Sequence, residues 1–371
     1  MRIYLDNNAT TMIHPEVLDV LSATLRDVFG NASSIHKEGQ TARQVIEDAR
    51  ESVASLIGAT AREIVFTSGG TESNNAAIFG AVPLPGRSHI VTSTIEHPSI
   101  LEAVRELERR GHEVTCVVPS RDGVVSAAEV IAALRPETKL VTIMLANNET
   151  GVVQPVGEIG AACRARSIHF HCDAVQAAGK IAIDVNALQC DTLALSAHKI
   201  HAPKGIGALY VRRGITMAPH LYGGAQERRR RAGTENVPLA AAFGAAARLA
   251  ATPVSPELRD RFEHALRETF GAGLTINGAN VTRLPNTSNV TFHDVDGEGI
   301  VIALDLSGVA VSTGSACSSG RVEPSPVLLA MGLSPAAAKG TVRFSFSRFT
   351  TEEEVARVIG LLAAVVPKCR R

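Results

Sequence analysis

In the stretch Thr192-Leu193-Ala194-Leu195-Ser196-Ala197-His198-Lys199, an apolar run that predicts a buried strand ends in a hydroxyl, an imidazole and a lysine. Burial disfavours an ammonium ion, so a lysine in such a place either finds a partner or loses its proton and becomes a nucleophile. A neutral lysine at the end of a strand suits an imine with pyridoxal phosphate. Most lysines near strand ends are merely solvated, and the rest of the chain decides between the two interpretations.

Strand-like and helical patterns alternate on both sides of this stretch. The strand-like runs fall at residues 63–67, 89–93, 113–118, 140–145, 169–172, 192–195 and 208–211, and helical patterns at 42–57, 72–81, 99–110, 127–134, 157–165 and 240–251. Such alternation is typical of an α/β fold whose mostly parallel sheet is covered by helices on both faces. Ligands bind at the carboxyl ends of the strands in these sheets, and many polar residues of this chain lie there.

A break follows at residues 252–256, where the sequence reads Thr-Pro-Val-Ser-Pro. Beyond it we expect a helix at 297–306, a strand at 341–346 and a helix at 352–365. This change of pattern predicts a large α/β domain over residues 12–252. A smaller α+β domain is expected from residues 1–11 and 253–371.

The composition indicates a globular protein with a large aliphatic core. Of its 371 residues, 45% are hydrophobic but only 4% are aromatic. The 37 Lys and Arg residues balance 37 Asp and Glu residues, which gives no general attraction to nucleic acid or to an anionic membrane. No apolar run reaches membrane-spanning length, and the chain turns polar directly after Met1. We therefore expect neither a nucleic-acid nor a membrane partner.

The six cysteines show neither CxxC pairs nor the dense spacing of a disulfide-rich domain. Cys116, in a strand-like run, and Cys163, on a helical pattern, are predicted to be small core residues. This usage is typical of a reducing compartment, and we expect the protein in the cytoplasm.

Residues 67–75, Thr-Ser-Gly-Gly-Thr-Glu-Ser-Asn-Asn, follow a predicted strand and open a helix. Backbone N–H groups at such a helix start favour phosphate. An ordinary capped turn is the alternative. The spacing of the glycines matches neither a Walker loop nor a dinucleotide-binding fingerprint, which disfavours nucleotide binding.

His169, His171 and Asp173 point to one face of a predicted strand, which permits a metal site. No second cluster of ligands with recognisable spacing accompanies them. The alternative places Asp173 just past the strand, against a protonated pyridine nitrogen. Gln176, one helical turn later, could then donate a hydrogen bond to a phenolic oxygen of the same ring.

Two more predicted strands end in polar residues that could meet a cofactor. His97, in Glu96-His97-Pro98, could stack on a flat ring and exchange protons near neutral pH, or it could be a solvated loop residue. Residues 147–151, Asn-Asn-Glu-Thr-Gly, could bind a carboxylate or a phenolate oxygen, or they could form a plain turn.

Cys317 lies in the stretch 312–320, Ser-Thr-Gly-Ser-Ala-Cys-Ser-Ser-Gly. Glycine and serine remove packing constraints, so the pattern predicts a mobile loop. A thiol on such a loop is a candidate nucleophile, and an incidental cysteine is the alternative. Arg343, within a predicted strand, needs an acidic partner or a carboxylate ligand.

Taken together, these motifs resemble the cysteine desulfurases, the NifS/IscS-like members of the class V aminotransferase family of pyridoxal-phosphate enzymes. The similarity runs nearly end to end, through residues 5–11, 30–34, 68–74, 96–98, 147–151, 173–176, 196–207, 226–228, 233–236 and the Cys317 loop. Ala225 and Arg229 depart from the glycines usual in the family, which puts the conformation of that loop in doubt.

The resemblance implies a fold-type-I homodimer with a seven-stranded sheet. It makes Lys199 the lysine that binds the cofactor, Asp173 the partner of the ring nitrogen and His97 the stacking residue. The phosphate would be held by Gly70, Thr71, Ser196 and His198, with Thr234 reaching it from the neighbouring subunit. Asn148 and Gln176 would contact the ring oxygen and the substrate, and Asn31 and Arg343 would hold the substrate carboxylate.

The implied reaction removes sulfur from L-cysteine. Lys199, displaced by the substrate, would take its α-proton, with His97 as a proton shuttle. The Cys317 thiolate would then attack the sulfur, leaving alanine and a persulfide for an acceptor such as an iron–sulfur cluster assembly scaffold. A different class V lyase, such as a selenocysteine lyase, and a non-catalytic scaffold are the alternatives.

Overall fold

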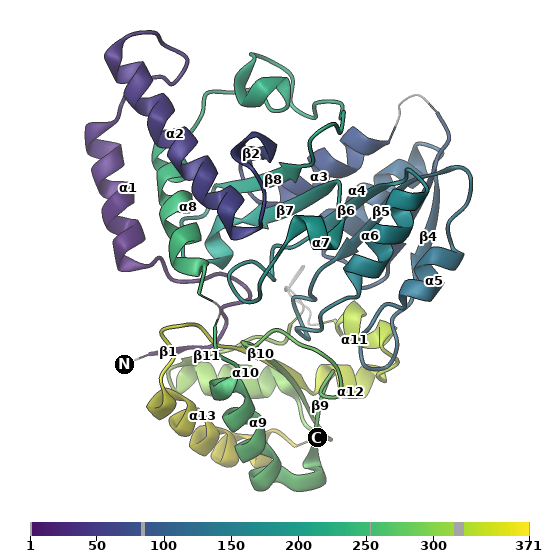
Figure 1. Ribbon diagram of the computed structural model, residues 1–371. Coiled ribbons are helices and arrows are strands. Elements are labelled where there is room, and N and C mark those ends of the chain that lie inside the picture. The colour runs from purple at the N-terminus through teal and green to yellow at the C-terminus, as the bar shows by residue number, and fades with distance from the viewer. Residues whose placement is uncertain (1, 83–85, 253, 315–322, 371) are drawn as a thin grey trace.

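The computed structural model describes residues 2–82, 86–252, 254–314 and 323–370, and its larger part is built on a seven-stranded sheet (Figure 1). In spatial order the strands are β2 (Ile64–Thr67), β8 (Gly207–Val211), β7 (Thr192–Ser196), β6 (His169–Asp173), β5 (Thr138–Met144), β3 (His89–Ser93) and β4 (Glu113–Val117). Only β8 runs antiparallel to its neighbours β2 and β7, and the other pairs are parallel. The predicted mostly parallel sheet is confirmed.

Helices cover both faces of this sheet. Successive residues of each strand point to opposite faces, so each strand contributes to two hydrophobic clusters. Ile90 and Leu140 pack with residues of α3 (Gly70–Ala81) and α4 (Pro98–Arg109). The next residues along these strands, Val91 and Val141, belong to a second hydrophobic cluster, which includes residues of α6 (Val156–Ala165). The short helices α5 (Ala127–Ala132) and α7 (Val185–Leu188) pack against α6.

Three helices form a further layer beside β2 and β8 (Figure 1). They are α1 (Pro15–Asp27), α2 (Lys37–Leu56) and α8 (Val237–Ala250). α8 is almost entirely alanine and glycine on its buried side, and a Cβ at Gly244 would lie 2.6 Å from Ala49 Cα. The small side chains therefore let α2 and α8 approach closely.

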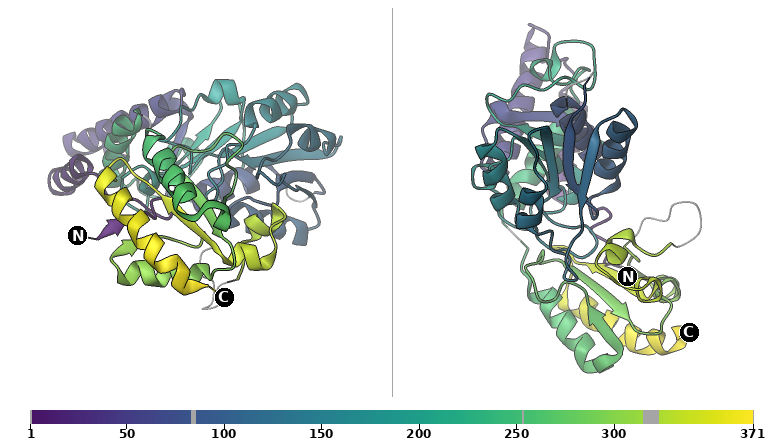
Figure 2. Two further views of the ribbon diagram at one scale, coloured as in Figure 1. Left: turned by 90° about the horizontal axis from the view of Figure 1, so that it is seen from below. Right: turned by 90° about the vertical axis from the view of Figure 1, so that its right-hand side faces the viewer.

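The smaller part of the molecule lies below the large sheet (Figures 1 and 2). It contains the antiparallel sheet β12 (Thr341–Ser345), β10 (Thr287–Phe292) and β9 (Leu274–Ile276), the parallel pair β1 (Ile3–Tyr4) and β11 (Val309–Ala310), and the helices α9 (Glu257–Phe270), α10 (Gly297–Leu306), α11 (Pro326–Ala330), α12 (Pro335–Lys339) and α13 (Glu352–Val365). Its core holds Phe262, Phe344 and Phe346. The domain boundaries at 12–252 and at 1–11 with 253–371 stay a prediction.

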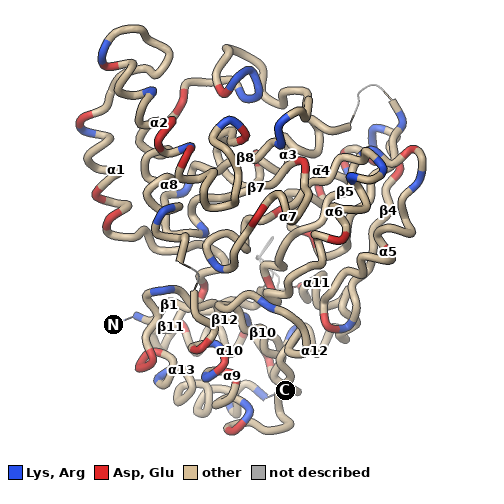
Figure 3. Tube along the Cα trace, in the orientation of Figure 1, with Lys and Arg blue, Asp and Glu red and all other residues tan. Residues whose placement is uncertain are grey.

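Charged residues of both signs are interspersed over the two parts of the molecule (Figure 3). Among the described residues, no helix combines the length and the apolar character needed to cross a membrane. Cys163 is buried in α6 as expected, but the prediction for Cys116 is wrong, because its side chain is exposed. Cys116 belongs to β4, which lies at the edge of the sheet.

Candidate active site

A cavity of about 290 Å³ opens at the carboxyl ends of β6 and β7, beside the start of α3. Its position is the one that parallel sheets favour for ligands. It is lined by Ala9, Gly70, Thr71, Asn74, His97, Ser99, Met144, Ala146, Asn148, Asp173, Val175, Gln176, Ser196, His198 and Lys199. Nine of the residues singled out from the sequence therefore come together: Gly70, Thr71, His97, Asn148, Asp173, Gln176, Ser196, His198 and Lys199.

Lys199 ends the short 3₁₀ turn η2 (Ala197–Lys199) directly after β7, so the strand carries its amine to the cavity. Lys199 Nζ donates hydrogen bonds to the backbone oxygens of Asn8 at 2.5 Å and Ala9 at 2.8 Å. Burial, helped by the positive charge of Arg343, lowers the pKa of Lys199 to about 8. A neutral amine has two N–H groups, and both are engaged here, which leaves its lone pair for an electrophile.

Asp173 is the last residue of β6, because this strand extends one residue beyond the predicted run 169–172. Its Oδ1 accepts the N–H of Val175 at 3.0 Å, and its Oδ2 accepts Asn74 Nδ2 at 2.8 Å. Asn74 had no predicted role. It lies one helical turn after Gly70 on the same face of α3, and this spacing was the available signal.

His97 caps the start of α4, where Nδ1 of its ring accepts the backbone N–H of Ser99 at 3.1 Å. Ser99 Oγ lies 2.8 Å from the same nitrogen. Burial lowers the pKa of His97, with a further lowering by Lys199 that Asp173 opposes. The ring is therefore neutral at neutral pH and keeps Nε2 for a ligand.

Hydrogen-bond donors surround the end of the cavity at the start of α3. Gly70 and Thr71 begin this helix, and Ser196 and His198 face them from the end of β7 and from η2. A Cβ at Gly70 would lie 2.8 Å from Val175 Cγ2, so a side chain does not fit there. Burial lowers the pKa of His198 to about 4, and its Nδ1 lies 3.1 Å from Thr10 Oγ1.

Gln176 is held by two residues that had no predicted role. Lys180 Nζ donates to Gln176 Oε1 at 2.8 Å, and Gln176 Nε2 donates to the backbone oxygen of Asn8 at 2.9 Å. Burial lowers the pKa of Lys180 well below its usual value. One N–H of the Gln176 amide thus remains for the cavity.

Arg343, on β12, has an acidic partner. Arg343 Nη2 donates to Asp6 Oδ1 at 2.7 Å, and Arg343 Nη1 donates to the backbone oxygen of Asn148 at 3.0 Å. Its Nε is buried without a partner among the described residues. Arg343 does not line the cavity itself, but it bonds to the backbone of Asn148, which does.

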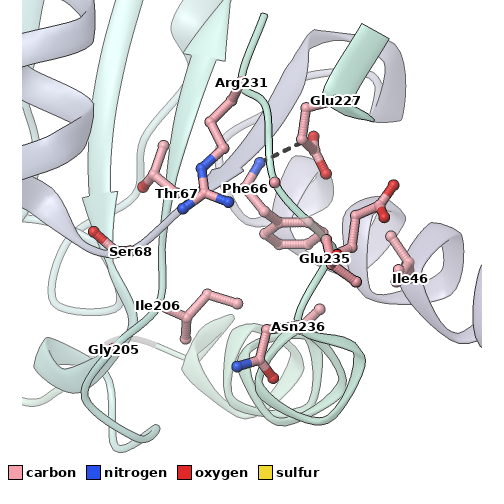
Figure 4. A pocket seen from close by; sticks show the side chains of 13 residues that line it. Ile46, Phe66, Thr67, Ser68, Gly205, Ile206, Glu227, Arg231, Glu235 and Asn236 are labelled. Atoms are coloured by element: carbon pink, nitrogen blue, oxygen red, sulfur yellow. Dashed lines mark hydrogen bonds between the residues drawn. The ribbon is translucent and has the colours of Figure 1, made fainter. Parts of the chain in front are cut away.

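Asn31 and Thr234, like Arg343, are not among the residues that line this cavity. Cys317 lies outside the described residues. Asn31 is exposed in the segment between α1 and α2, where Asn31 Oδ1 accepts the N–H of Ser33. Thr234 lines a different cavity of about 140 Å³, at which Figure 4 shows Phe66 and Arg231.

The two histidines of β6 are engaged in the core. His169 Nε2 and His171 Nδ1 lie 3.0 and 2.9 Å from Thr192 Oγ1. Burial lowers the pKa of His169 to about 4 and that of His171 to about 3. Within the part of the chain that the structure describes, no three His, Cys, Asp or Glu side chains are grouped to hold a metal ion.

Residues 3–358 match the family model described as "Aminotransferase class-V". The chain is 47% identical to a cysteine desulfurase of Trichormus azollae, over 99% of this chain and 94% of that protein. It is 46% identical to a cysteine desulfurase IscS of Anaeromyxobacter dehalogenans, over 99% and 93% of the two chains. A solved NifS-like protein superposes with a TM-score of 0.90 and 34% identity, over 98% of this chain and 99% of that chain.

Proposed function

Since this chain belongs to the cysteine desulfurases of the class-V aminotransferase family, we propose that it moves sulfur from L-cysteine to Cys317 with pyridoxal phosphate held at Lys199. Its fold is that of the fold-type-I pyridoxal-phosphate enzymes, as predicted. The observation that carries the proposal is the cavity in which Lys199, Asp173 and His97 meet.

The donors and acceptors of the cavity fit pyridoxal phosphate. Lys199 offers an amine of lowered pKa to the aldehyde, and Asp173 offers a carboxylate to the ring nitrogen. The backbone N–H groups at the start of α3, where Gly70 and Thr71 line the cavity, suit the phosphate. The remaining phosphate contacts fall to Thr71, Ser196 and His198, and the contacts to the ring oxygen to Asn148 and Gln176.

When bound, the cofactor supplies an electron sink for the α-carbon of the amino acid. Lys199, once displaced by the substrate amine, is the base that takes the α-proton, because its lowered pKa leaves part of it neutral. His97, which lines the same cavity, would stack on the cofactor ring and exchange protons with the substrate through Nε2. The Cys317 thiolate attacks the substrate sulfur: a sulfur–sulfur bond forms, the carbon–sulfur bond breaks with its electron pair left on carbon, and alanine results after protonation.

Arg343 and Asn31 complete the site by holding the substrate carboxylate. The buried Nε of Arg343, which lacks a partner among the described residues, supports this role. The ion pair with Asp6 keeps the guanidinium in place beside the loop that carries Asn148.

A second copy of the chain supplies Thr234 to the phosphate. Within one chain Thr234 lines a different cavity from Lys199, which supports its contribution from a neighbouring subunit. Large apolar side chains between residues 12 and 35 are exposed, with Leu25 at 63%, Phe29 at 83% and Ile35 at 91% of their surface. Exposed apolar surface of this kind is typical of an interface between subunits and supports a homodimer.

The Cys317 persulfide passes its sulfur to an acceptor protein, for which an iron–sulfur cluster assembly scaffold is the proposed class. A location in the cytoplasm also stays a prediction. The balanced charge of the chain favours neither nucleic acid nor an anionic membrane as a partner.

The test supplies L-cysteine to the cofactor-loaded protein and measures alanine together with the mass of the Cys317 peptide. We expect alanine in step with a persulfide on Cys317, and neither product from Lys199→Ala. Cys317→Ala is expected to abolish sulfur transfer. Alanine formation that survives Cys317→Ala would instead indicate a different class V lyase, and a protein that binds no pyridoxal phosphate would indicate a non-catalytic scaffold.

A further inference from the structure

The amide of Asn74 joins two parts of the site that the mechanism treats separately. Asn74 is 1% exposed on α3. Its Nδ2 donates to Asp173 Oδ2 and to Ser99 Oγ, both at 2.8 Å. Its Oδ1 lies 3.0 Å from His171 Nε2. Both N–H groups and the oxygen of one side chain are thus engaged.

The surroundings fix which way this amide points. An ionised carboxylate only accepts hydrogen bonds, so the Asp173 side of Asn74 must be the nitrogen. The oxygen then faces His171, whose Nε2 must carry a proton. Thr192 Oγ1, at 2.9 Å, is the partner of His171 Nδ1. A reversed amide would place its oxygen against the carboxylate and its nitrogen against the Nε2 proton.

Ser99 links Asn74 to His97. The backbone N–H of Ser99 donates to His97 Nδ1 at 3.1 Å. A ring nitrogen that accepts this N–H carries no proton, so the proton of neutral His97 lies on Nε2. The Ser99 hydroxyl, 2.8 Å from the same nitrogen, must then donate to it, and a lone pair of its oxygen accepts Asn74 Nδ2.

We propose that Asn74 is a positioning residue that holds the Asp173 carboxylate with one N–H and, with the other, holds the Ser99 hydroxyl that donates to His97 Nδ1 and so supports the Nε2–H tautomer. The inference rests on the proposed function for the roles of Asp173 and His97. It means that His97 meets the substrate first as a proton donor at Nε2. It also means that one amide, that of Asn74, helps to position both Asp173, which would face the ring nitrogen, and His97, which would stack on the ring.

The test measures the imidazole nitrogens of His97 by ¹⁵N NMR in the full-length chain, with and without pyridoxal phosphate. His97→Gln assigns the signals. We expect the wild type to hold the Nε2–H tautomer. Ser99→Ala removes the hydroxyl that donates to Nδ1, and Asn74→Ala removes the amide that holds this hydroxyl, so both are expected to displace the Nδ1 signal. The dissociation constant of pyridoxal phosphate is expected to rise about 10- to 100-fold in Asn74→Ala, the loss of one hydrogen bond to a charged group, and to change less in Ser99→Ala.

Asn75→Ala is the matched control, because Asn75 is the next residue of α3 and its Nδ2 reaches only the backbone oxygens of Thr71 and Ser99. It is expected to leave both measurements unchanged. The His89 signals, from a ring bonded to Thr138 and Thr115, report whether each variant is folded. An Nδ1–H tautomer in the wild type overturns the inference, as does a folded Asn74→Ala with wild-type signals and affinity. The His97 tautomer is measured without any turnover of substrate. A failure of the proposed reaction would therefore be seen separately, as wild-type protein that forms no alanine.

Discussion

Ser325 Oγ donates a hydrogen bond of 2.5 Å to Glu149 Oε2, and this bond ties the start of α11 to the loop that follows β5. The same serine caps α11 by accepting the N–H of Leu328. Glu149 is buried, and burial raises the pKa of its carboxyl group. On its other side, Glu149 Oε2 lies 3.0 Å from the place that a Cβ on Gly314 would take. One carboxyl group therefore bonds to Ser325 and lies close to Gly314, on either side of the stretch that carries Cys317.

Replacing this serine tests the strength of that connection. Ser325→Ala is expected to lower the free energy of unfolding by about 2–4 kcal/mol, because a helix cap and a hydrogen bond to a buried carboxyl group are both lost. Ser334 caps α12 in the same way through the N–H of Ala337 but bonds to no carboxylate among the described residues. Ser334→Ala should therefore cost only about 1 kcal/mol in urea unfolding. Equal losses in the two variants would show that the bond to Glu149 adds nothing.

The lowered pKa of Lys199 predicts how its reactivity depends on pH. Because burial and Arg343 lower this pKa to about 8, attachment of pyridoxal phosphate should speed up as the pH rises through about 8. Arg343→Gln removes a positive charge and frees Asp6, and both changes favour the ammonium form. The midpoint is therefore expected at higher pH in this variant. Borohydride trapping followed by mass spectrometry measures the rate.

Lys204→Gln is the control for this experiment, since Lys204 is an exposed lysine five positions away. Its midpoint should match that of the wild type. A midpoint that moves to lower pH in Arg343→Gln would contradict the electrostatic argument.

The backbone at Arg229 predicts a stabilising substitution. Arg229, in the 3₁₀ segment η3 (Gln226–Arg229), has a φ of +65°, which costs an L-residue about 1–2 kcal/mol. Arg229→Gly should therefore raise the free energy of unfolding by about 1 kcal/mol after the entropy cost of glycine is subtracted. Ala225, the other departure from the family glycines, has a φ of −84°. Ala225→Gly should lower stability by about 0.5–1 kcal/mol, and a gain there would show that φ is not the cause.

The buried ion pair between Arg50 and Glu227 predicts a large effect. Arg50 Nη1 lies 2.6 Å from Glu227 Oε2, and both side chains are 2% exposed. Glu227→Gln leaves the buried guanidinium with the longer pair to Glu47, 3.3 Å from Arg50 Nε, as its remaining charge partner among the described residues, which should cost about 3 kcal/mol in urea unfolding. The exposed pair of Arg2 and Asp305 is the comparison, and Arg2→Ala should cost at most about 1 kcal/mol. Similar losses from the two variants would rule out burial as the reason.

The sheet could be predicted because buried strands of a parallel sheet are apolar along their whole length. β3 begins and ends where the pattern placed it, and β5 differs by two residues at its start. α1 was not predicted. Its Leu18 and Leu25 are exposed, so its apolar residues do not mark a single buried face.

Within the site, the sequence revealed the residues that end strands but not the ones that hold them. Lys199 stood out because a strand leads to it. Its acceptors are backbone oxygens from a segment 190 and 191 residues earlier, and no side-chain pattern encodes such a contact. Ser99 acts through its backbone N–H as well as its hydroxyl, which is equally invisible in a sequence. For Asn31 and Thr234 the obstacle is different, because a single chain does not bring them to the cavity.

The bond between Asn8 and Ser345 joins the two ends of the chain beside the site. The N–H of Asn8 donates to Ser345 Oγ, a residue 337 positions later. Ribosomes make the N-terminus first, and contacts between residues so far apart close a long loop at a cost in entropy. The carbonyl oxygen of Asn8 also accepts Gln176 Nε2, so residues made long before Ser345 can already hold this acceptor of the Lys199 amine. Synthesis of the last strand therefore adds a second hold on Asn8 to one that the growing chain can already form.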